Sequence, residues 1–196
     1  IRRLCFSLDY DKKQGNEISC TGSIIKEHLI NLDFYHPIKE FVWVIQNSNI
    51  LTNNDKQPFG GNEWFNFGVS QACSSKGDIN KNNDNNSYPE LSPMNDMVLY
   101  IEGRERFQRR NQRFFNLVQM WERHSNMTNR WIYCYSFAFE PENIQPSGTC
   151  NYSRIDNSHI IINTNRNLVD PVFTMFGVNY NILRIKGGMA GVAYSS

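Results

Sequence analysis

Residues 145–157 read QPSGTCNYSRIDN, a polar run with one clear aliphatic residue, and they closely follow residues 131–143, WIYCYSFAFEPEN. The earlier stretch alternates aromatic with smaller residues, which predicts a β-strand with an aromatic face. The aromatic positions are Tyr133, Tyr135, Phe137 and Phe139. Pro141 ends the pattern, because proline cannot donate a hydrogen bond to a sheet. We therefore predict a strand, a tight reversal and a new segment.

The reversal itself is predicted at residues 145–148. These residues have the form of a type I turn, because Pro146 fixes φ at the second position and Gly148 closes the fourth. The segment that follows is expected to be extended, with Arg154 and Asp156 suited to tie neighbouring loops by charge-assisted hydrogen bonds. The residues predicted to form this structural site are Gln145, Pro146, Ser147, Gly148, Arg154 and Asp156.

Further strand signals recur along the chain at irregular spacing. The expected strands lie within residues 2–10, 36–46, 95–103, 131–139, 158–163, 178–187 and 187–194, with a short one near 64–67. Long, turn-rich loops separate them, including an asparagine-rich segment at 74–92 that has almost nothing to bury. This organisation favours an all-β fold, and within it an eight-stranded antiparallel jelly roll over a meander.

One segment, residues 104–124, reads as partly helical. Its apolar residues recur at helical spacing, at Phe107, Phe114, Phe115, Val118 and Trp121. Arginines crowd the same segment, and phosphate binding is one interpretation of them. Glutamates lie among the arginines, so a solvated, salt-bridged face is the favoured interpretation, and we predict no direct contact with nucleic acid.

Length and charge limit the remaining possibilities. The chain has 196 residues and a formal net charge of +1, which fits one domain, 1–196, without a global field that would recruit nucleic acid or a membrane. No apolar run approaches the roughly 20 residues of a transmembrane helix. The start at Ile1 suggests a processed product or a fragment.

The cysteines point to a reducing compartment, and that bears on the glycosylation sequons. Five widely spaced cysteines form no C-x-x-C pair, and they are interpreted as reduced thiols. They are Cys5, Cys20, Cys73, Cys134 and Cys150. Three N-x-S/T sequons begin at Asn85, Asn126 and Asn151, and each is expected to be unmodified in such a compartment.

The signatures of common enzymes are absent from the sequence. His28, His36, His124 and His159 are scattered, without metal-ligand spacing. No nucleophile elbow, phosphate-binding glycine loop or zinc-protease motif occurs. We therefore predict no catalytic residues, no metal and no cofactor.

Four sequence blocks resemble motifs of a known protein family. YSFAFEPENIQPSGTCNYSRIDN, at residues 135–157, resembles the Y-S-F-A-L-x-P-E…Q-P-S-G-T-C-N-F-S-R-I-D run of the major capsid proteins of nucleocytoplasmic large DNA viruses, of the iridovirus, phycodnavirus and mimivirus types. Three more blocks are similar to family motifs in the same order: HPIKEFVWVIQ at 36–46, RFFNLVQ at 113–119 and NYNILRIKGGMAGVAYSS at 179–196. The resemblance covers the chain from about residue 32 onward.

The resemblance implies a structural virion protein. Its fold would be the C-terminal one of two consecutive jelly rolls, and its subunits would form homotrimeric, pseudo-hexagonal capsomers that tile an icosahedral capsid. The implied partners are other major capsid subunits, neighbouring capsomers, minor capsid proteins and an inner viral membrane. Assembly would take place in the host cytoplasm. Two alternatives stay open: a minor capsid protein or diverged paralogue, and a surface jelly roll that binds glycans.

Overall fold

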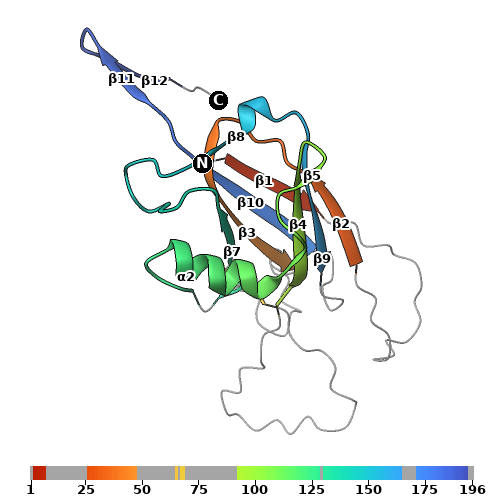
Figure 1. Cartoon of the computed structure of the whole chain (residues 1–196). Helices are drawn as coiled ribbons and strands as arrows, with labels where there is room; N and C mark the ends of the chain where they lie inside the picture. The colour runs from red at the N-terminus through yellow and green to blue at the C-terminus, as the bar shows by residue number, and fades with distance from the viewer. Residues whose placement is uncertain are drawn as a thin grey trace, which may run out of the picture.

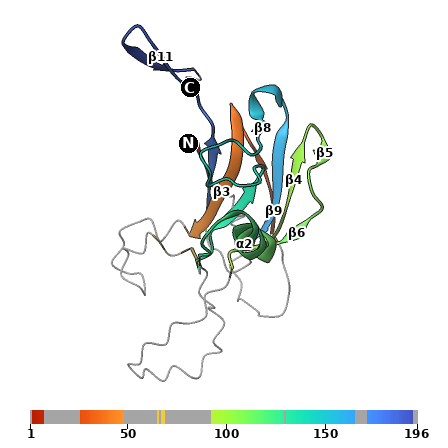
Figure 2. The same cartoon turned by 60° about the vertical axis from the view of Figure 1, so that its left-hand side comes forward.

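Two antiparallel sheets face each other in the computed structural model (Figures 1 and 2). The structure describes residues 2–7, 26–47, 65, 67–68, 92–128, 130–164 and 171–193. The first sheet has the order β1 (Arg2–Ser7), β10 (Pro171–Asn179), β3 (Pro37–Asn47), β7 (Tyr133–Ser136), and β8 (Cys150–Asn151) also pairs with β3. The second has the order β2 (Lys26–Asn31), β9 (Ser158–Thr164), β4 (Met94–Ile101), β5 (Arg104–Glu105), and β6 (Arg110–Asn111) also pairs with β4.

The chain crosses repeatedly between the sheets. β1, β3, β7 and β10 lie in the first sheet, and β2, β4, β5 and β9 lie in the second. Strands distant in sequence are therefore neighbours, as β1 and β10 are, which is the arrangement of a jelly roll. The predicted all-β jelly-roll class is confirmed, and the strand count is approximate because short strands add to these eight.

The core lies between the sheets and is rich in aromatic residues. On β3, Phe41, Trp43 and Ile45 point inward at alternate positions and are almost fully buried. Trp43 stacks on Tyr133 with ring centroids 5.9 Å apart and meets Phe115 edge-on at 5.3 Å. The facing sheet contributes buried aliphatic residues, among them Met97, Leu99, Ile160 and Ile162. Of the predicted aromatic face, Tyr133 is buried and Tyr135 and Phe137 pack against the core, whereas Phe139 is exposed and the prediction is wrong there.

Besides the two-residue strands β5 and β6, two longer strands, β10 and β2, were not expected from the sequence. β10 lies between β1 and β3, and its burial alternates apart from Thr174, but apolar residues occupy both of its faces, so its sequence shows no alternation of apolar and polar residues. β2 is an edge strand with Ile30 as its one buried residue among those whose side chains are described. The expected strand at 178–187 instead divides between the end of β10 and a separate strand. The strand expected near 64–67 lies largely outside the described residues.

The helical segment is present, but its predicted apolar stripe holds at Phe107, Phe114 and Phe115 and is wrong at the two later positions. It comprises a π-helical stretch, η1 (Phe114–Val118), followed by α2 (Gln119–Arg123). Phe115 is buried, whereas Val118 and Trp121 are exposed. A π-helical turn bonds i to i+5 and therefore shifts the phase of a pattern with a 3.6-residue period. Phe107 precedes the helix and packs on Phe115 with ring centroids 5.5 Å apart.

The helix protects the free edge of β7. The Asn116 amide donates to the carbonyls of Arg130 (2.9 Å) and Ile132 (2.7 Å). The N–H of Ser136 donates to Gln119 Oε1 at 3.2 Å. Buried side chains thus satisfy backbone groups that would otherwise be open to pairing with another strand.

The arginines of this segment have local roles. Arg109 forms ion pairs with Glu27 (2.7 Å) and Asp96 (2.8 Å), which links β2 to β4. Arg110 lies over the ring of Phe114 at 5.4 Å. These contacts agree with a salt-bridged face. No helix in the described part of the chain is long and apolar enough to cross a membrane.

Candidate functional site

The connection between β7 and β9, residues 137–157, contains the singled-out motif. It begins by staying against β3, because the N–H groups of Phe137 and Ala138 both donate to the carbonyl of Lys39, at 2.8 and 3.1 Å. The Lys39 ammonium then donates to the carbonyl of Pro141 at 2.6 Å. One residue of β3 therefore holds the start of the connection with both its backbone and its side chain.

The hydrogen-bonded turn lies earlier than predicted. The N–H of Asn143 donates to the carbonyl of Glu140 at 3.3 Å, with Pro141 in the second position. Among the described residues no such bond closes Gln145–Gly148, so the type I turn predicted there is wrong. Proline at the second position favours a turn equally at Pro141 and at Pro146. The turn that forms is the one at Pro141, whose carbonyl accepts the hydrogen bond from the Lys39 ammonium.

Ser147 closes the loop, residues 139–147, by hydrogen bonds where the chain reverses direction. Its hydroxyl accepts from the N–H of Glu140 (2.8 Å) and donates to the Glu140 carbonyl (3.1 Å), while its own carbonyl accepts from Phe139 (3.5 Å). Gln145 and Pro146 are exposed on the return segment. The serine of the motif thus closes the loop through both backbone and side chain.

Gly148 lies where the return segment touches the end of the aromatic strand. Its φ of +151° is a conformation that residues with a side chain rarely adopt. A Cβ at this position would lie 2.7 Å from the carbonyl oxygen of Phe137 and 3.3 Å from the Cα of Ala138. The glycine is therefore required for both its conformation and its close approach.

The second half of the connection is bonded to residues 36–38 and forms a short helical turn there instead of running extended. β8 pairs with Pro37 and Ile38, and residues Tyr152–Arg154 form a short 3-10 helix, η2. His36 bonds this helix twice: its carbonyl accepts from the N–H of Tyr152 (3.1 Å) and its N–H donates to Ser153 Oγ (2.9 Å). The extended conformation predicted for this segment is therefore wrong beyond Asn151.

Tyr152 anchors the helix in the core. Its ring is buried and meets those of Phe41 (5.3 Å), Phe34 (6.1 Å) and Phe137 (6.3 Å) edge-on. Burial raises the pKa of its hydroxyl, which accepts a hydrogen bond from Ser158 Oγ at 3.4 Å. The connection is thus fastened to both sheets.

Arg154 and Asp156 are both exposed, and neither side chain has a hydrogen bond or ion pair among the described residues. The loop-tying role expected of them belongs to Glu102. Its carboxylate accepts from the N–H of Asp156 (2.7 Å) and of Asn157 (3.2 Å), which fixes the entry to β9. The sequence offered no signal for Glu102, because its partners are backbone groups about 54 residues away.

A histidine between two carboxylates ties the connection to the end of α2. His124 Nε2 lies 3.3 Å from Glu40 on β3, and its Nδ1 lies 3.3 Å from Glu142. The Glu40 carboxylate is the main cause that raises the pKa of His124 above its usual value. Hydrogen bonds from Ser125 are the main cause that lowers the pKa of Glu142, and His124 adds to them.

Other candidate chemistry finds no site in the part of the chain that the structure describes. No group of three or more His, Cys, Asp or Glu residues is arranged to hold a metal ion there. Cys134 and Cys150 are free thiols, and burial raises the pKa of both. Asn126 and Asn151 are exposed, and Asn151 Oδ1 accepts from the N–H of Ser153. The sequon at Asn85 lies outside the described residues.

The arrangement defines a class of protein, a jelly-roll sandwich whose most specific sequence motif fixes the connection between β7 and β9. Comparison with known proteins agrees. The family model for the large eukaryotic DNA virus major capsid protein matches residues 13–191, and the chain belongs to this family. The resemblance seen in the sequence is confirmed.

Individual relatives give the same result. The chain is 44% identical over 102 residues to the major capsid protein of Phaeocystis pouchetii virus, covering 50% of this chain and 20% of the relative. It is 30% identical over 203 residues to that of Pyramimonas orientalis virus, covering 92% and 42%. The quasi-atomic model of the PBCV-1 virus capsid matches 100% of this chain and 50% of its own, with 25% identity and a TM-score of 0.68.

The chain therefore spans half or less of the length of these relatives. The matched relatives are structural components of virus capsids and not enzymes, in agreement with the prediction from the sequence.

Proposed function

We propose that residues 1–196 form the C-terminal jelly roll of a major capsid protein and that the function of this domain is capsid assembly. The observation that carries the proposal is the jelly-roll topology of the whole described chain, which matches half of a PBCV-1 capsid chain. The position of the motifs supports the C-terminal half, because the final block resembles the closing block of the family.

The hydrogen-bonded connection between β7 and β9, residues 137–157, is suited to a role in capsid assembly. Gln145, Pro146, Ser147 and Gly148 form the return of the loop, and Arg154 and Asp156 stand exposed beyond it. A shell subunit needs loops of defined shape, since contacts between subunits depend on complementary surfaces. We infer that these six residues are a structural signature: the first four hold the loop, and the two charges remain available to a neighbour.

In this proposal the subunits form homotrimers with a pseudo-hexagonal outline, and the trimers tile an icosahedral capsid. A three-fold ring closes through head-to-tail interfaces, so each subunit presents two different surfaces. The further partners are neighbouring capsomers, minor capsid proteins and an inner viral membrane beneath the shell. The domain would act within the virion after assembly in the host cytoplasm.

The test is to add an N-terminal jelly roll to the chain. The 196-residue chain is purified alone and as a fusion behind the N-terminal half of the Pyramimonas orientalis virus relative, and both are measured by light scattering. We expect monomers or heterogeneous oligomers from the chain alone and a discrete trimer from the fusion. A monodisperse trimer from the chain alone would identify it as a complete single-jelly-roll capsid protein, and a fusion that forms no trimer would contradict the proposal.

A further inference from the structure

His124 lies at the C-terminal end of α2 with a carboxylate on each side of its ring. Its Nε2 lies 3.3 Å from Glu40 Oε2, and its Nδ1 lies 3.3 Å from Glu142 Oε1. A neutral imidazole carries one N–H, so its other nitrogen would turn a lone pair toward a carboxylate. The imidazolium has two N–H groups and a positive charge, and it suits both neighbours. The arrangement therefore favours the protonated ring.

The two carboxylates differ in their access to water. The side chain of Glu40 is 10% exposed, whereas that of Glu142 is 48% exposed. Glu40 Oε2 has no hydrogen-bond partner among the described residues, so its charge depends on the nearby ring. Glu142 Oε1 also accepts from the N–H of Ser125 at 3.1 Å. Because water can solvate Glu142 but not Glu40, a ring with a single proton keeps it toward Glu40.

The other charged and titratable groups close to His124 do not share this position. Arg123 and Lys39 both donate to backbone carbonyls of the connection. Burial raises the pKa of the Cys134 thiol to about 12, and Glu40 adds to the effect, so the thiol is uncharged at neutral pH. Of all these groups, the imidazole is the one whose ordinary pKa lies near neutrality.

The segment that carries Glu142, residues 139–144, presents two large apolar side chains to solvent. Phe139 is 67% exposed and Ile144 is 95% exposed. The Glu142 carboxylate joins this segment to the end of α2 through His124 and Ser125. Without the contact to His124, the bond from the Ser125 N–H remains. The charge of one ring therefore affects how firmly an exposed apolar segment is held.

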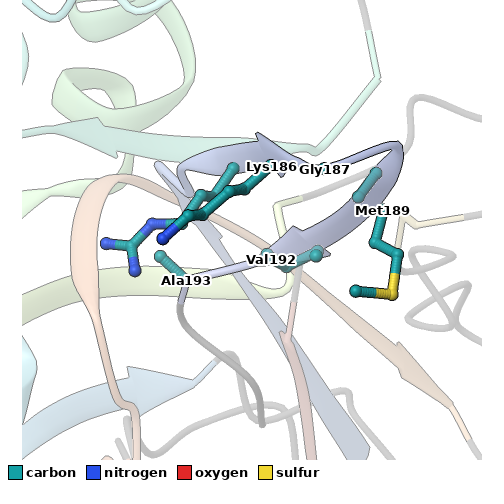
Figure 3. A pocket seen from close by; sticks show the side chains of 8 residues that line it. Lys186, Gly187, Met189, Val192 and Ala193 are labelled. Atoms are coloured by element: carbon teal, nitrogen blue, oxygen red, sulfur yellow. The ribbon is translucent and has the colours of Figure 1, made fainter.

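A second projecting segment lacks such a group. The hairpin of β11 (Leu183–Lys186) and β12 (Met189–Val192) stands away from the sandwich (Figures 1 and 2). At its turn, Gly187 and Gly188 have φ values of +60° and +79°, as a type I′ turn requires. An open hollow beside the hairpin is lined in part by Lys186, Met189 and Val192 (Figure 3). Residues 181–193 contain no histidine and no carboxylate side chain, so the hairpin can serve as an internal reference.

We propose that His124 is a proton-sensitive switch: the imidazolium holds residues 139–144 against the end of α2, and the neutral ring stays with Glu40 and releases Glu142, so that the segment opens. The Glu40 carboxylate is the main cause that raises the pKa of His124 above 6.5. The segment is therefore held below that pH and opens as the pH rises through the folded-state value. All these contacts lie within one copy of the chain, so the inference does not depend on the proposed function.

The test is backbone hydrogen exchange of the 196-residue chain, followed by mass spectrometry at about pH 6 and about pH 9 and corrected for the intrinsic exchange rate. Residues 139–147 should lose protection at the higher pH, whereas residues 183–192 should show the same protection at both. Because proton binding and closure are linked, the loss is about tenfold if the folded-state pKa of His124 is one unit above its ordinary value. An NMR titration of the His124 Cε1 proton supplies that pKa independently.

His124→Gln cannot gain a charge, so residues 139–147 should exchange as fast at about pH 6 as they do in the wild type at about pH 9. Glu142→Gln should reduce the pH response. His159→Gln, on β9 and stacked on Tyr100 at 4.9 Å, is the matched control and should respond like the wild type. Equal protection of residues 139–147 at both pH values in the wild type, or a full pH response in His124→Gln, would overturn the switch. Neither result bears on capsid assembly, which the light-scattering experiment tests separately.

Discussion

Gly148 shows at the scale of one residue how the motif acts. The return segment passes so close to the end of the aromatic strand that a Cβ would lie 2.7 Å from the Phe137 carbonyl oxygen. That oxygen belongs to the backbone and cannot rotate away as a side chain can. The cost of a substitution is therefore a displacement of the whole return segment.

We expect Gly148→Val to destabilise the fold by about 3 kcal/mol or more, because a steric clash adds to an unfavourable φ. Thermal unfolding followed by circular dichroism measures the change, and soluble yield should fall with it. Gly191→Ala is the control, since a Cβ there meets nothing within 4 Å and should leave the melting temperature unchanged. Equal melting temperatures for Gly148→Val and the wild type would contradict the role assigned to this glycine.

At the scale of elements, the helix and β7 depend on two buried amides. Asn116 and Gln119 bond the backbone at the edge of β7 instead of burying apolar surface. The small residues Cys134, Ser136 and Ala138 on the other face of this strand are buried within the chain itself.

Asn116→Leu should lower the free energy of unfolding by about 1–3 kcal/mol, because it leaves the carbonyls of Arg130 and Ile132 without their donor. Chemical denaturation gives the value. Glu122→Gln, on the exposed side of the same helix, should change it little. An Asn116→Leu protein as stable as the wild type would show that these bonds do not hold the edge.

The contacts of His124, at the end of α2, with Glu40 and Glu142 should respond to pH. The pKa of His124 is raised above 6.5, so its stabilising effect is complete below that pH and is lost as the pH rises through the folded-state value. The pKa of Glu142 is lowered below 4.5, so its effect is complete above that pH and is lost on further acidification. Both contributions are present together between pH 4.5 and 6.5.

The melting temperature of His124→Gln should therefore fall furthest below that of the wild type between pH 4.5 and 6.5, and the gap should narrow toward alkaline pH. Glu142→Gln should reproduce part of the effect. A gap that is constant from acid to alkaline pH would mean that His124 is not charged in the folded protein.

At the scale of the whole molecule, the two sheets share one core. Trp43 and Phe41 from the first sheet lie in the same buried cluster as Leu99 and Ile160 from the second. Neither sheet can keep its inner face from water without the other.

Unfolding of the 196-residue chain at low concentration should therefore be one cooperative transition. Tryptophan fluorescence and far-ultraviolet circular dichroism should give the same midpoint. With either probe, Trp43→Ala should lower the free energy of unfolding by about 3–5 kcal/mol. Two separate midpoints would show that 1–196 is not a single domain.

Much of the fold could be predicted from local pattern. Alternation at residues 36–46 and 131–139 indicated β3 and β7 because one face of each strand is buried and the other is not. β10 could not be recognised in this way, since it carries apolar residues such as Phe173 and Phe176 on both faces, although only one face is regularly buried. The helix stripe failed at Val118 and Trp121 because a π-helical turn changed the phase of the pattern, and no local sequence signal predicts that turn.

The sequence by itself determined the all-β class, the capsid protein family and the residue types that a tight crossing needs, because proline, glycine and serine have conformational and bonding preferences that act locally. Tertiary structure alone decided which of two prolines makes the turn, that Glu102 rather than Arg154 or Asp156 ties the loops, and that His124 meets Glu40 and Glu142. These contacts join residues far apart in the chain. Their partners are chosen by the register of the sheets, which depends on the packing of the whole core.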